Sequence, residues 1–237
     1  MSVGDLARRR VLLTGASRGV GRAVARRLVA AGADVVGVGR DEQALDELAR
    51  SLTSGPGSFV PVAVDLTDPA TPALLADVVD QRWGALDVLF SNAGVMLARD
   101  ERIEDEPAGT LEETLAVNLV APHRLVLALL PALRAGKEPQ VVHVGSGAGT
   151  LDGTAEPGIA SYRVSKFALN GLVLVQAAQL RGEVAVNAFD PGWVRTDLGG
   201  PEAPGTVEES ADGAMALLAE PVTVTGKFFK DGVEIPF

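Results

Sequence analysis

Short β-branched runs alternate with longer segments of helical spacing along most of this 237-residue chain. The runs are too apolar to face water, and the longer segments repeat apolar residues every three or four positions. A parallel sheet covered by helices on both faces satisfies both patterns, so we predict an α/β fold with a doubly wound, mostly parallel seven-stranded sheet. We expect strands at Val11–Leu13, Val35–Val38, Phe59–Val64, Val88–Phe90, Val141–Val144, Val184–Ala188 and Gly226–Phe229, and helices at 19–31, 41–52, 69–83, 110–134, 161–181 and 207–219.

The composition agrees with one globular domain. Hydrophobic residues make up 47% of the chain and aromatic residues only 4%, so the core must consist mainly of Ala, Val and Leu. We find no internal repeat, low-complexity linker or composition break, and therefore assign residues 1–237 to a single domain. The chain has no cysteine, which excludes disulfides, thiolate metal sites and a cysteine nucleophile.

The charge and hydropathy restrict the partners. A net charge of −10 makes the chain a poor ligand for nucleic acid or an anionic membrane surface. No apolar run approaches the ~18 residues that span a bilayer, and the run Val11–Leu13 after the basic start is too short for a signal peptide. We therefore expect a cytoplasmic protein without nucleic-acid or membrane partners. We interpret the acidic run 100–106 as a solvated loop, and His123 and His143, the only histidines, as structural residues outside any triad or metal site.

A glycine turn follows the first expected strand. In a doubly wound sheet, ligands bind beyond the carboxyl ends of the strands, where the strand order reverses. The sequence at this point is TGASRGVG, residues 14–21. A glycine turn that leads into a helix lets backbone N–H groups approach a phosphate and directs the helix dipole at it. Gly15, Gly19 and Gly21 therefore predict a dinucleotide-phosphate site, against the alternative of a plain strand–helix turn.

Two arginines suggest which dinucleotide is bound. Arg40 follows the second strand, where a protein that binds NAD would have Asp or Glu for the ribose hydroxyls. A basic residue suits the 2′-phosphate of NADP instead, and Arg18 in the glycine turn could reach the same group. Either arginine alone could be an ordinary surface charge, but together they predict NADP.

The remaining strand ends also carry small or polar residues. They are Asp65, Ser91–Gly94, Gly145–Gly147 and Asp190–Thr196, and together they predict a cleft long enough for an extended dinucleotide.

Tyr162 is the only tyrosine of the chain, and Lys166, one of four lysines, follows four positions later. Residues four apart share one face of a helix, so these two side chains are expected to project together into the cleft.

With these features the chain resembles the short-chain dehydrogenase/reductase family, from Val11 to the C-terminus. The motifs occur in family order: TGASRGVG at 14–21, Asp65, SNAG at 91–94, Asn118, Ser146, Tyr162-Arg-Val-Ser-Lys166 and PGWVRT at 191–196. A lone Tyr-x-x-x-Lys is a weak signal, whereas the ordered set is specific. Ser91, Gly145 and the long interval between Ser146 and Tyr162 depart from the commoner pattern without removing a residue of the tetrad described next.

The resemblance implies a Rossmann-type fold and a catalytic tetrad of Asn118, Ser146, Tyr162 and Lys166. Tyr162 would act as general acid and base, its pKa lowered from about 10 by the Lys166 ammonium and the oxidised nicotinamide. Ser146 would donate a hydrogen bond to the substrate oxygen, and Lys166 would hold the ribose hydroxyls. The expected contacts with NADP are Gly15, Ser17, Arg18, Gly19, Val20, Gly21, Arg40, Asp65, Leu66, Asn92, Ala93, Gly94, Tyr162, Lys166, Pro191, Gly192, Val194 and Thr196.

We therefore predict an NADP-dependent oxidoreductase that transfers hydride between nicotinamide and a carbonyl or secondary alcohol. A non-catalytic dinucleotide-binding sensor is the alternative, because fold alone does not separate the two. Family members commonly pair the helices that correspond to 110–134 and 161–181, so the resemblance also implies a homodimer or homotetramer. The Gly- and Pro-rich segment after Pro191 predicts a mobile flap over the substrate.

Overall fold

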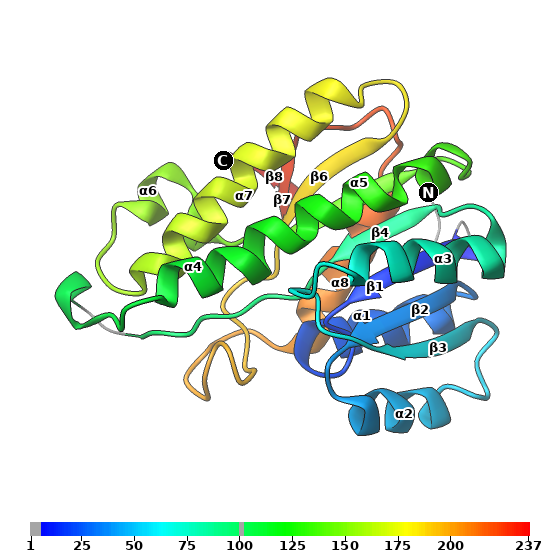
Figure 1. The fold of residues 1–237 in the computed structure, drawn as a ribbon, viewed down its shortest axis with the longest axis horizontal. Helices are drawn as coiled ribbons and strands as arrows, with labels where there is room; N and C mark the ends of the chain where they lie inside the picture. Colours follow the sequence, from blue (N-terminus) through cyan, green and yellow to red (C-terminus); the bar gives the residue numbers. More distant parts are fainter. Residues whose placement is uncertain (1–5, 100–101) are drawn as a thin grey trace.

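The seven predicted strands lie in one sheet and run parallel to one another (Figure 1). The structure is a computed structural model that describes residues 6–99 and 102–237. The strand order is β3-β2-β1-β4-β5-β6-β7-β8, so the order reverses between β1 and β4. The predicted fold class is confirmed. The strands are β1 (Arg10–Thr14), β2 (Asp34–Gly39), β3 (Ser58–Ala63), β4 (Val88–Ser91), β5 (Gln140–Val144), β6 (Ala185–Asp190), β7 (Phe228–Lys230) and β8 (Val233–Ile235).

The strand β8 was not predicted. It pairs antiparallel with β7 at the edge of the sheet, with Phe228 opposite Ile235. Asp231 and Gly232 form the turn between the two strands and have φ angles of +50° and +76°. An Asp-Gly pair is the usual signal for such a tight hairpin turn. The strand has only three residues, which is too short to show an alternating pattern.

Helices cover both faces of the sheet and form two separate cores (Figure 1). On one face, apolar side chains such as Val24, Leu28 and Leu217 pack against the strands. On the other face, Leu75, Leu129 and Val173 do the same. The first face carries α1 (Gly19–Ala30), α2 (Glu42–Ser51) and α8 (Val207–Leu218), and the second carries α3 (Thr71–Trp83), α5 (Ala121–Arg134) and α7 (Ala160–Gln179).

The helix predicted for 110–134 is divided into three parts. They are α4 (Thr110–Leu115), a π-helical turn η3 (Ala116–Val120) and α5. The N–H of Ala121 bonds the carbonyl of Ala116, five residues back. Pro122 has no N–H to offer to the preceding turn, so regular α-helical bonding cannot continue through this point. The predicted helix is therefore present over 110–134, but Ala116–Val120, which includes Asn118, forms a π turn where it meets the proline.

The same segment also corrects the hydropathy expectation. Thr110–Arg134 comprises 25 residues with a mean hydropathy of 1.6, so by length and composition it could cross a membrane. In the fold it packs against α3 and α7, and 33% of the most apolar window is buried. Charged residues interrupt it at Glu112, Glu113 and Arg124, which is why the sequence shows no long uninterrupted apolar run.

Candidate active site

The glycine turn after β1 is built from close backbone contacts. Gly15 has a φ of +68°, and a Cβ added at Gly21 would lie 2.2 Å from the Gly15 carbonyl oxygen. Asn92 closes the turn from β4, because its Nδ2 donates to the carbonyls of Thr14 and Gly15 at 3.0 and 3.2 Å. The Thr14 hydroxyl accepts bonds from the N–H groups of Asn92 and Ala93, both at 3.0 Å. Only glycine fits this cradle at residue 21, which leaves the start of α1 open to a phosphate.

Charged side chains lie beyond the neighbouring strand ends. Arg18 pairs with Asp197 at 2.8 Å, and both side chains are more than 70% exposed. Arg40 is exposed at the end of β2. Bonds from the N–H and hydroxyl of Thr67 lower the pKa of Asp65, and the positive charge of Arg40 contributes less. Arg40 and Asp65 are thus neighbours, as expected at one end of a dinucleotide cleft, while Arg18 is engaged with the segment after β6.

The structure brings the remaining predicted cofactor residues to the same edge of the sheet. A Cβ added at Gly19 would lie 3.2 Å from Thr196 Cγ2, so the segment after β6 touches the glycine turn. A Cβ added at Gly94 would lie 3.4 Å from Lys166 Nζ. The cleft therefore joins the glycine turn to the Tyr162–Lys166 pair. Its predicted lining comes from the ends of β1 (Gly15, Ser17, Gly19, Val20, Gly21), β3 (Asp65, Leu66), β4 (Asn92, Ala93, Gly94) and β6 (Pro191, Gly192, Val194, Thr196).

Asn118 links three parts of the site through its buried amide. Its Oδ1 accepts the N–H of Val95 at 2.8 Å, and its Nδ2 donates to the Val95 carbonyl at 2.9 Å. The same Nδ2 donates to Ser165 Oγ at 2.9 Å, and Ser165 Oγ donates to the Tyr162 carbonyl at 2.7 Å. The π turn thus places the predicted asparagine where it joins the segment after β4 to the helix that carries Tyr162.

Lys166 is buried behind Tyr162. Lys166 is only 3% exposed. Its Nζ donates to the Val144 carbonyl at 2.8 Å and lies 5.7 Å from the centroid of the Tyr162 ring. Burial lowers the pKa of Lys166 to about 8, and the carboxylate of Asp190 opposes this shift. The ammonium is therefore close to titrating at neutral pH, unlike an exposed lysine.

The expected direction of the Tyr162 pKa is wrong for the protein alone. Burial raises the pKa of Tyr162 to about 12, the hydrogen bond with Ser146 acts in the opposite direction, and Asp190 adds to the increase. We expected the ammonium of Lys166 to lower this pKa, but desolvation of the phenolate is the largest effect. The protein alone therefore holds Tyr162 as a neutral phenol, which is the proton-donating form.

Ser146 caps the turn after β5, and Asp190 connects that turn to the end of β6. The Ser146 hydroxyl accepts the N–H of Ala148 at 3.1 Å. The Asp190 carboxylate accepts the N–H of Gly147 at 3.1 Å and that of Gly192 at 2.9 Å. Asp190 also lies 4.0 Å from Lys230 Nζ and is only 5% exposed. The sequence showed Asp190 only as a polar strand end, and its contacts identify it as the carboxylate that joins the two strand ends.

Comparison with known proteins gives the same picture as this geometry. The family model described as "short chain dehydrogenase" matches residues 9–205. The chain belongs to the short-chain dehydrogenase family. The predicted resemblance is therefore confirmed, and with it the general activity of the family, NAD(P)-dependent oxidation and reduction.

Two curated relatives and one solved structure illustrate the likeness within the short-chain dehydrogenase family. The chain is 29% identical to (+)-neomenthol dehydrogenase from Arabidopsis thaliana, over 93% of this chain and 95% of that protein. It is 34% identical to Short chain dehydrogenase tazN from Aspergillus terreus over 81% of this chain, but spans only 43% of that protein. The crystal structure of NADPH-bound carbonyl reductase from chicken fatty liver aligns with a TM-score of 0.87 at 30% identity, covering 98% of this chain and all (100%) of that one.

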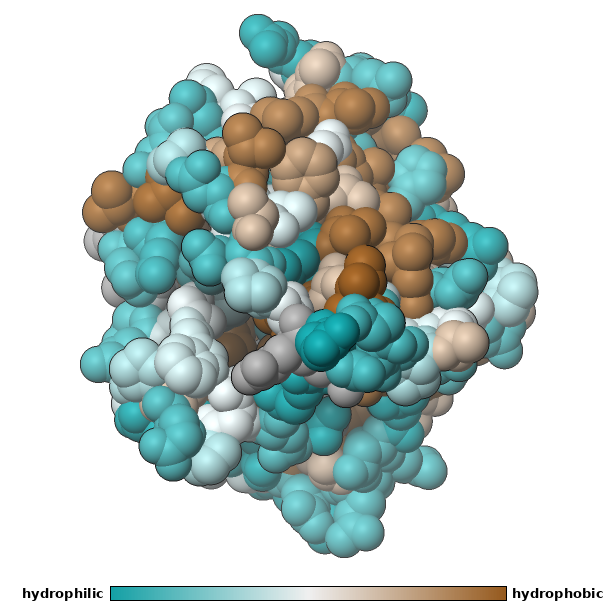
Figure 2. All heavy atoms as spheres, turned by 90° about the vertical axis from the view of Figure 1, so that its left-hand side faces the viewer, coloured by the Kyte–Doolittle hydropathy of each residue, from teal (hydrophilic) through white to brown (hydrophobic). Residues whose placement is uncertain are grey.

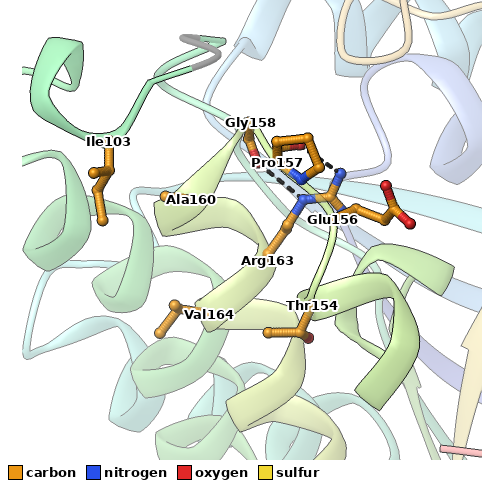
Figure 3. A pocket seen from close by; sticks show the side chains of 8 residues that line it. All are labelled: Ile103, Thr154, Glu156, Pro157, Gly158, Ala160, Arg163 and Val164. Atoms are coloured by element: carbon orange, nitrogen blue, oxygen red, sulfur yellow. Dashed lines mark hydrogen bonds between the residues drawn. The ribbon is translucent and has the colours of Figure 1, made fainter.

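Arginines that the sequence did not single out hold the rim of this short-chain dehydrogenase cleft. Arg163 donates to the carbonyls of Gly158 and Pro157 at 2.9 and 3.1 Å and also bonds the Gly153 carbonyl. Figure 3 shows its side chain turned toward Gly158 and Pro157, at a pocket of about 330 Å³ between η2 (Ile103–Asp105) and α7. Arg163 thus fixes the segment that includes α6 (Leu151–Thr154), which follows η4 (Gly147–Gly149).

Two further arginines fix the segment after β6. Arg99 donates to the carbonyls of Asp197 and Leu198 at 3.1 and 2.6 Å. Arg195 donates to the carbonyls of Ala203 and Pro204 at 2.9 and 2.7 Å. The predicted flap is therefore bonded both to itself and to the segment after β4. Its mobility stays a prediction.

His143 is a structural residue, as predicted, whereas part of the acidic run 100–106 contacts the rest of the protein. His143 is a core residue of β5 whose Nε2 lies 2.9 Å from Gln176 Oε1, and burial lowers its pKa to about 4. The interpretation of 100–106 as a solvated loop is wrong for Glu106, because its carboxylate binds Ser161 at the start of α7. Asp100 and Glu101 lie outside the described residues.

Proposed function

We propose that this short-chain dehydrogenase is an NADP-dependent oxidoreductase that transfers hydride between nicotinamide and a carbonyl compound or secondary alcohol. One observation carries the proposal: Ser146 and Tyr162 are partly exposed at the cleft, and Lys166 and Asn118 are buried directly behind them. A protein that only bound the dinucleotide would not need a hydrogen-bonded serine and a neutral phenol at this position. The residues 1–237 would form one such catalytic domain.

The glycine cradle supports a bound dinucleotide. Gly15 and Gly21 let the turn pack tightly against itself and against Asn92, and the backbone N–H groups at the start of α1 can then bind the phosphates of a dinucleotide. When bound, the nicotinamide supplies or accepts the hydride. Asn92 and Thr14 hold the turn in place, and Lys166 is near enough to the cradle to bind the ribose hydroxyls through Nζ.

The tetrad residues then have distinct roles. In carbonyl reduction, Tyr162 donates its phenolic proton to the substrate oxygen while Ser146 donates a hydrogen bond to the same oxygen. Lys166 stabilises the phenolate left on Tyr162, since its ammonium lies on the same face of α7. Asn118 positions Tyr162 through Ser165, whose hydroxyl bonds the Tyr162 carbonyl. In alcohol oxidation the proton moves in the opposite direction.

The preference for NADP rests on Arg18 and Arg40. Both lie beside the predicted adenosine end, where a 2′-phosphate would add charge-assisted hydrogen bonds. The chicken carbonyl reductase to which the chain is similar holds NADPH, which supports the same choice. The exposed pair of Arg18 with Asp197 is weak enough to yield to a phosphate, because exposed ion pairs contribute at most about 1 kcal/mol.

We also propose that the protein is a homodimer or homotetramer located in the cytoplasm. Figure 2 shows apolar side chains gathered on the side that carries α4, α5 and α7. The residues Val120 on η3, Leu127 on α5, and Phe167, Leu174 and Val175 on α7 are exposed to between 37% and 57%, which is more apolar surface than a helix facing water needs. The lack of cysteine fits a reducing compartment.

A direct assay tests this function. The purified protein is mixed with NADPH or NADH and a panel of ketones and aldehydes, and cofactor oxidation is followed by absorbance. We expect consumption of NADPH with at least one class of carbonyl. Tight NADPH binding without turnover across the panel, and equally without turnover of secondary alcohols with NADP⁺, would favour the sensor instead.

A further inference from the structure

The helix that carries Tyr162 begins without a cap of its own. The N-cap residue of α7 is Ile159, whose apolar side chain cannot accept a hydrogen bond and whose φ of +48° is left-handed. A β-branched residue in this conformation is strained. The first turn of the helix also contains no acidic residue. The N–H groups at the start of this 20-residue helix, and the positive end of its dipole, therefore need a partner from elsewhere.

Glu106 provides that partner from 55 residues earlier in the chain. Its Oε2 accepts the Ser161 hydroxyl at 2.6 Å, and its Oε1 accepts the Ser161 N–H at 3.1 Å. Ser161 is only 3% exposed and directly precedes Tyr162. The carboxylate thus replaces the missing N-cap side chain and places a negative charge at the helix N-terminus.

The chain between Val95 and Glu106 is attached to α7 at both ends. At Val95, the attachment runs through Asn118 to Ser165, whose hydroxyl bonds the Tyr162 carbonyl. At Glu106, it is the direct contact with Ser161. Tyr162 is therefore held by the residue before it and by the residue three positions after it.

We propose that Glu106 is a positioning residue that fixes the first turn of α7 and thereby sets the phenol of Tyr162 against the reacting oxygen. The proposal rests on the function proposed above. Proton transfer is sensitive to geometry, and a displacement of about 1 Å costs up to about 100-fold in rate. Loss of the cap moves the turn rather than removing a reacting group, so the effect on turnover is smaller than that of losing the phenol.

The test compares three variants with a control from the same loop. Glu106→Ala removes both bonds, Ser161→Ala removes the hydroxyl bond, and Glu106→Gln keeps the shape and can still bond both groups of Ser161. Glu104→Gln is the control, because the Glu104 carboxylate pairs with Arg102 in the same loop. For each variant we measure kcat per NADPH-binding site, KM for NADPH, the melting temperature, and the isotope effect with NADPH deuterated at the transferred position.

We expect Glu106→Ala to lower kcat per site about tenfold, with a smaller change in KM for NADPH and a larger isotope effect. Ser161→Ala should be intermediate, and Glu106→Gln and the control should stay within about twofold of the parent. A role in stability alone would lower the melting temperature or the number of binding sites and leave kcat per site and the isotope effect unchanged.

An unchanged kcat per site and isotope effect in Glu106→Ala would overturn the proposal. A Glu106→Gln variant as slow as Glu106→Ala, or a Glu104→Gln control with the same loss of kcat, would also overturn it. Tyr162→Phe is assayed in parallel to separate this inference from the proposed function. Turnover retained by Tyr162→Phe would refute the proposed mechanism and leave Glu106 no phenol to position. Turnover lost by Tyr162→Phe but normal in Glu106→Ala would refute only the inference.

Discussion

The two sides of the cleft are held by different means. On the cofactor side, the turn after β1 is shaped by glycines and by the short-range fit of Asn92 beneath them. At the rim, the segments 150–159 and 193–204 are held mainly by charged side chains, although Thr196 in the second segment also reaches the glycine turn. Arg163, Arg99 and Arg195 donate to loop carbonyls, and Glu106 accepts from the start of α7.

The difference separates a part of the cleft that tolerates few residue types from a part that tolerates many. A backbone cradle admits few sequences, because any Cβ at Gly21 would collide with the Gly15 carbonyl. A rim held by side-chain bonds can change its shape with one or two substitutions while the sheet beneath it stays the same. We therefore expect changes on the cofactor side to affect binding of the dinucleotide, and changes on the rim to affect the substrate.

The largest effect is expected where the two sides meet, at Tyr162. Replacing Tyr162 with Phe keeps the ring and removes the proton donor, so turnover should fall by about 10²–10⁴-fold. NADPH affinity and the melting temperature should stay close to those of the parent. Steady-state kinetics and a cofactor titration check this, and a variant within a few-fold of the parent would show that another group donates the proton.

The same comparison explains what the sequence could and could not predict. The glycine turn and the sheet follow from local patterns, since strand, turn and helix signals occur within a few residues of one another, whereas the tetrad was implied only by the ordered motifs of the family resemblance. The arginine contacts of the rim were not predictable, because their acceptors are backbone carbonyls that any residue could supply. Glu106 was missed for a related reason: an acidic run is usually solvated, and only the fold brings Ser161 to it.

Two other differences come from competing local rules. The π turn at Ala116–Val120 keeps the apolar pattern of a helix, so in the sequence only Pro122, which has no N–H to donate, indicates the interruption. The pKa of Tyr162 was expected to follow its charged neighbour, but the sequence does not report how deeply a phenol is buried. Burial, which raises the pKa to about 12, could be assessed only once the packing around α7 was known.

The next largest effect tests the cofactor side. Changing both Arg18 and Arg40 to Ala removes two cations from the predicted 2′-phosphate site, at about 1.5–3 kcal/mol for each charge-assisted bond. NADPH affinity should fall at least about a hundredfold while NADH affinity changes little. Titration of the double variant and of the parent with both dinucleotides measures this. Equal affinity of the parent for NADPH and NADH would contradict the proposed preference.

A smaller effect, on the KM for the substrate and not on NADPH affinity, is expected from a change at the rim. Changing Arg163 to Ala frees the carbonyls of Gly153, Pro157 and Gly158, so the segment they belong to loses its fixed position. The KM for the carbonyl substrate should rise about tenfold, with NADPH affinity unchanged. Arg134→Ala is a matched control, because Arg134 pairs with Glu183 on the surface away from the cleft. An increase in the Kd for NADPH in Arg163→Ala, with the substrate KM unchanged, would show that the two sides are not separable.

The smallest effect concerns the pH dependence of NADPH binding, through Lys166. Burial places the pKa of Lys166 at about 8 in the free protein, below the ordinary value of 10.5. Ribose hydroxyls and the dinucleotide phosphates favour the ammonium form of Lys166, so NADPH binding raises the pKa of Lys166. At pH values above the pKa of the free protein, binding therefore takes up a proton. Below pH 8 the proton is already present and affinity should be constant.

Above this pH affinity should decrease, being about twofold weaker at pH 8 and then falling up to about tenfold per unit. Lys166→Met is the control, since it should bind NADPH more weakly but without this dependence. Titrations between pH 6.5 and 9 decide the point. A parent whose NADPH affinity does not change over that range would mean that the neutral amine serves the ribose as well as the ammonium does, and that the charge of Lys166 matters only for Tyr162.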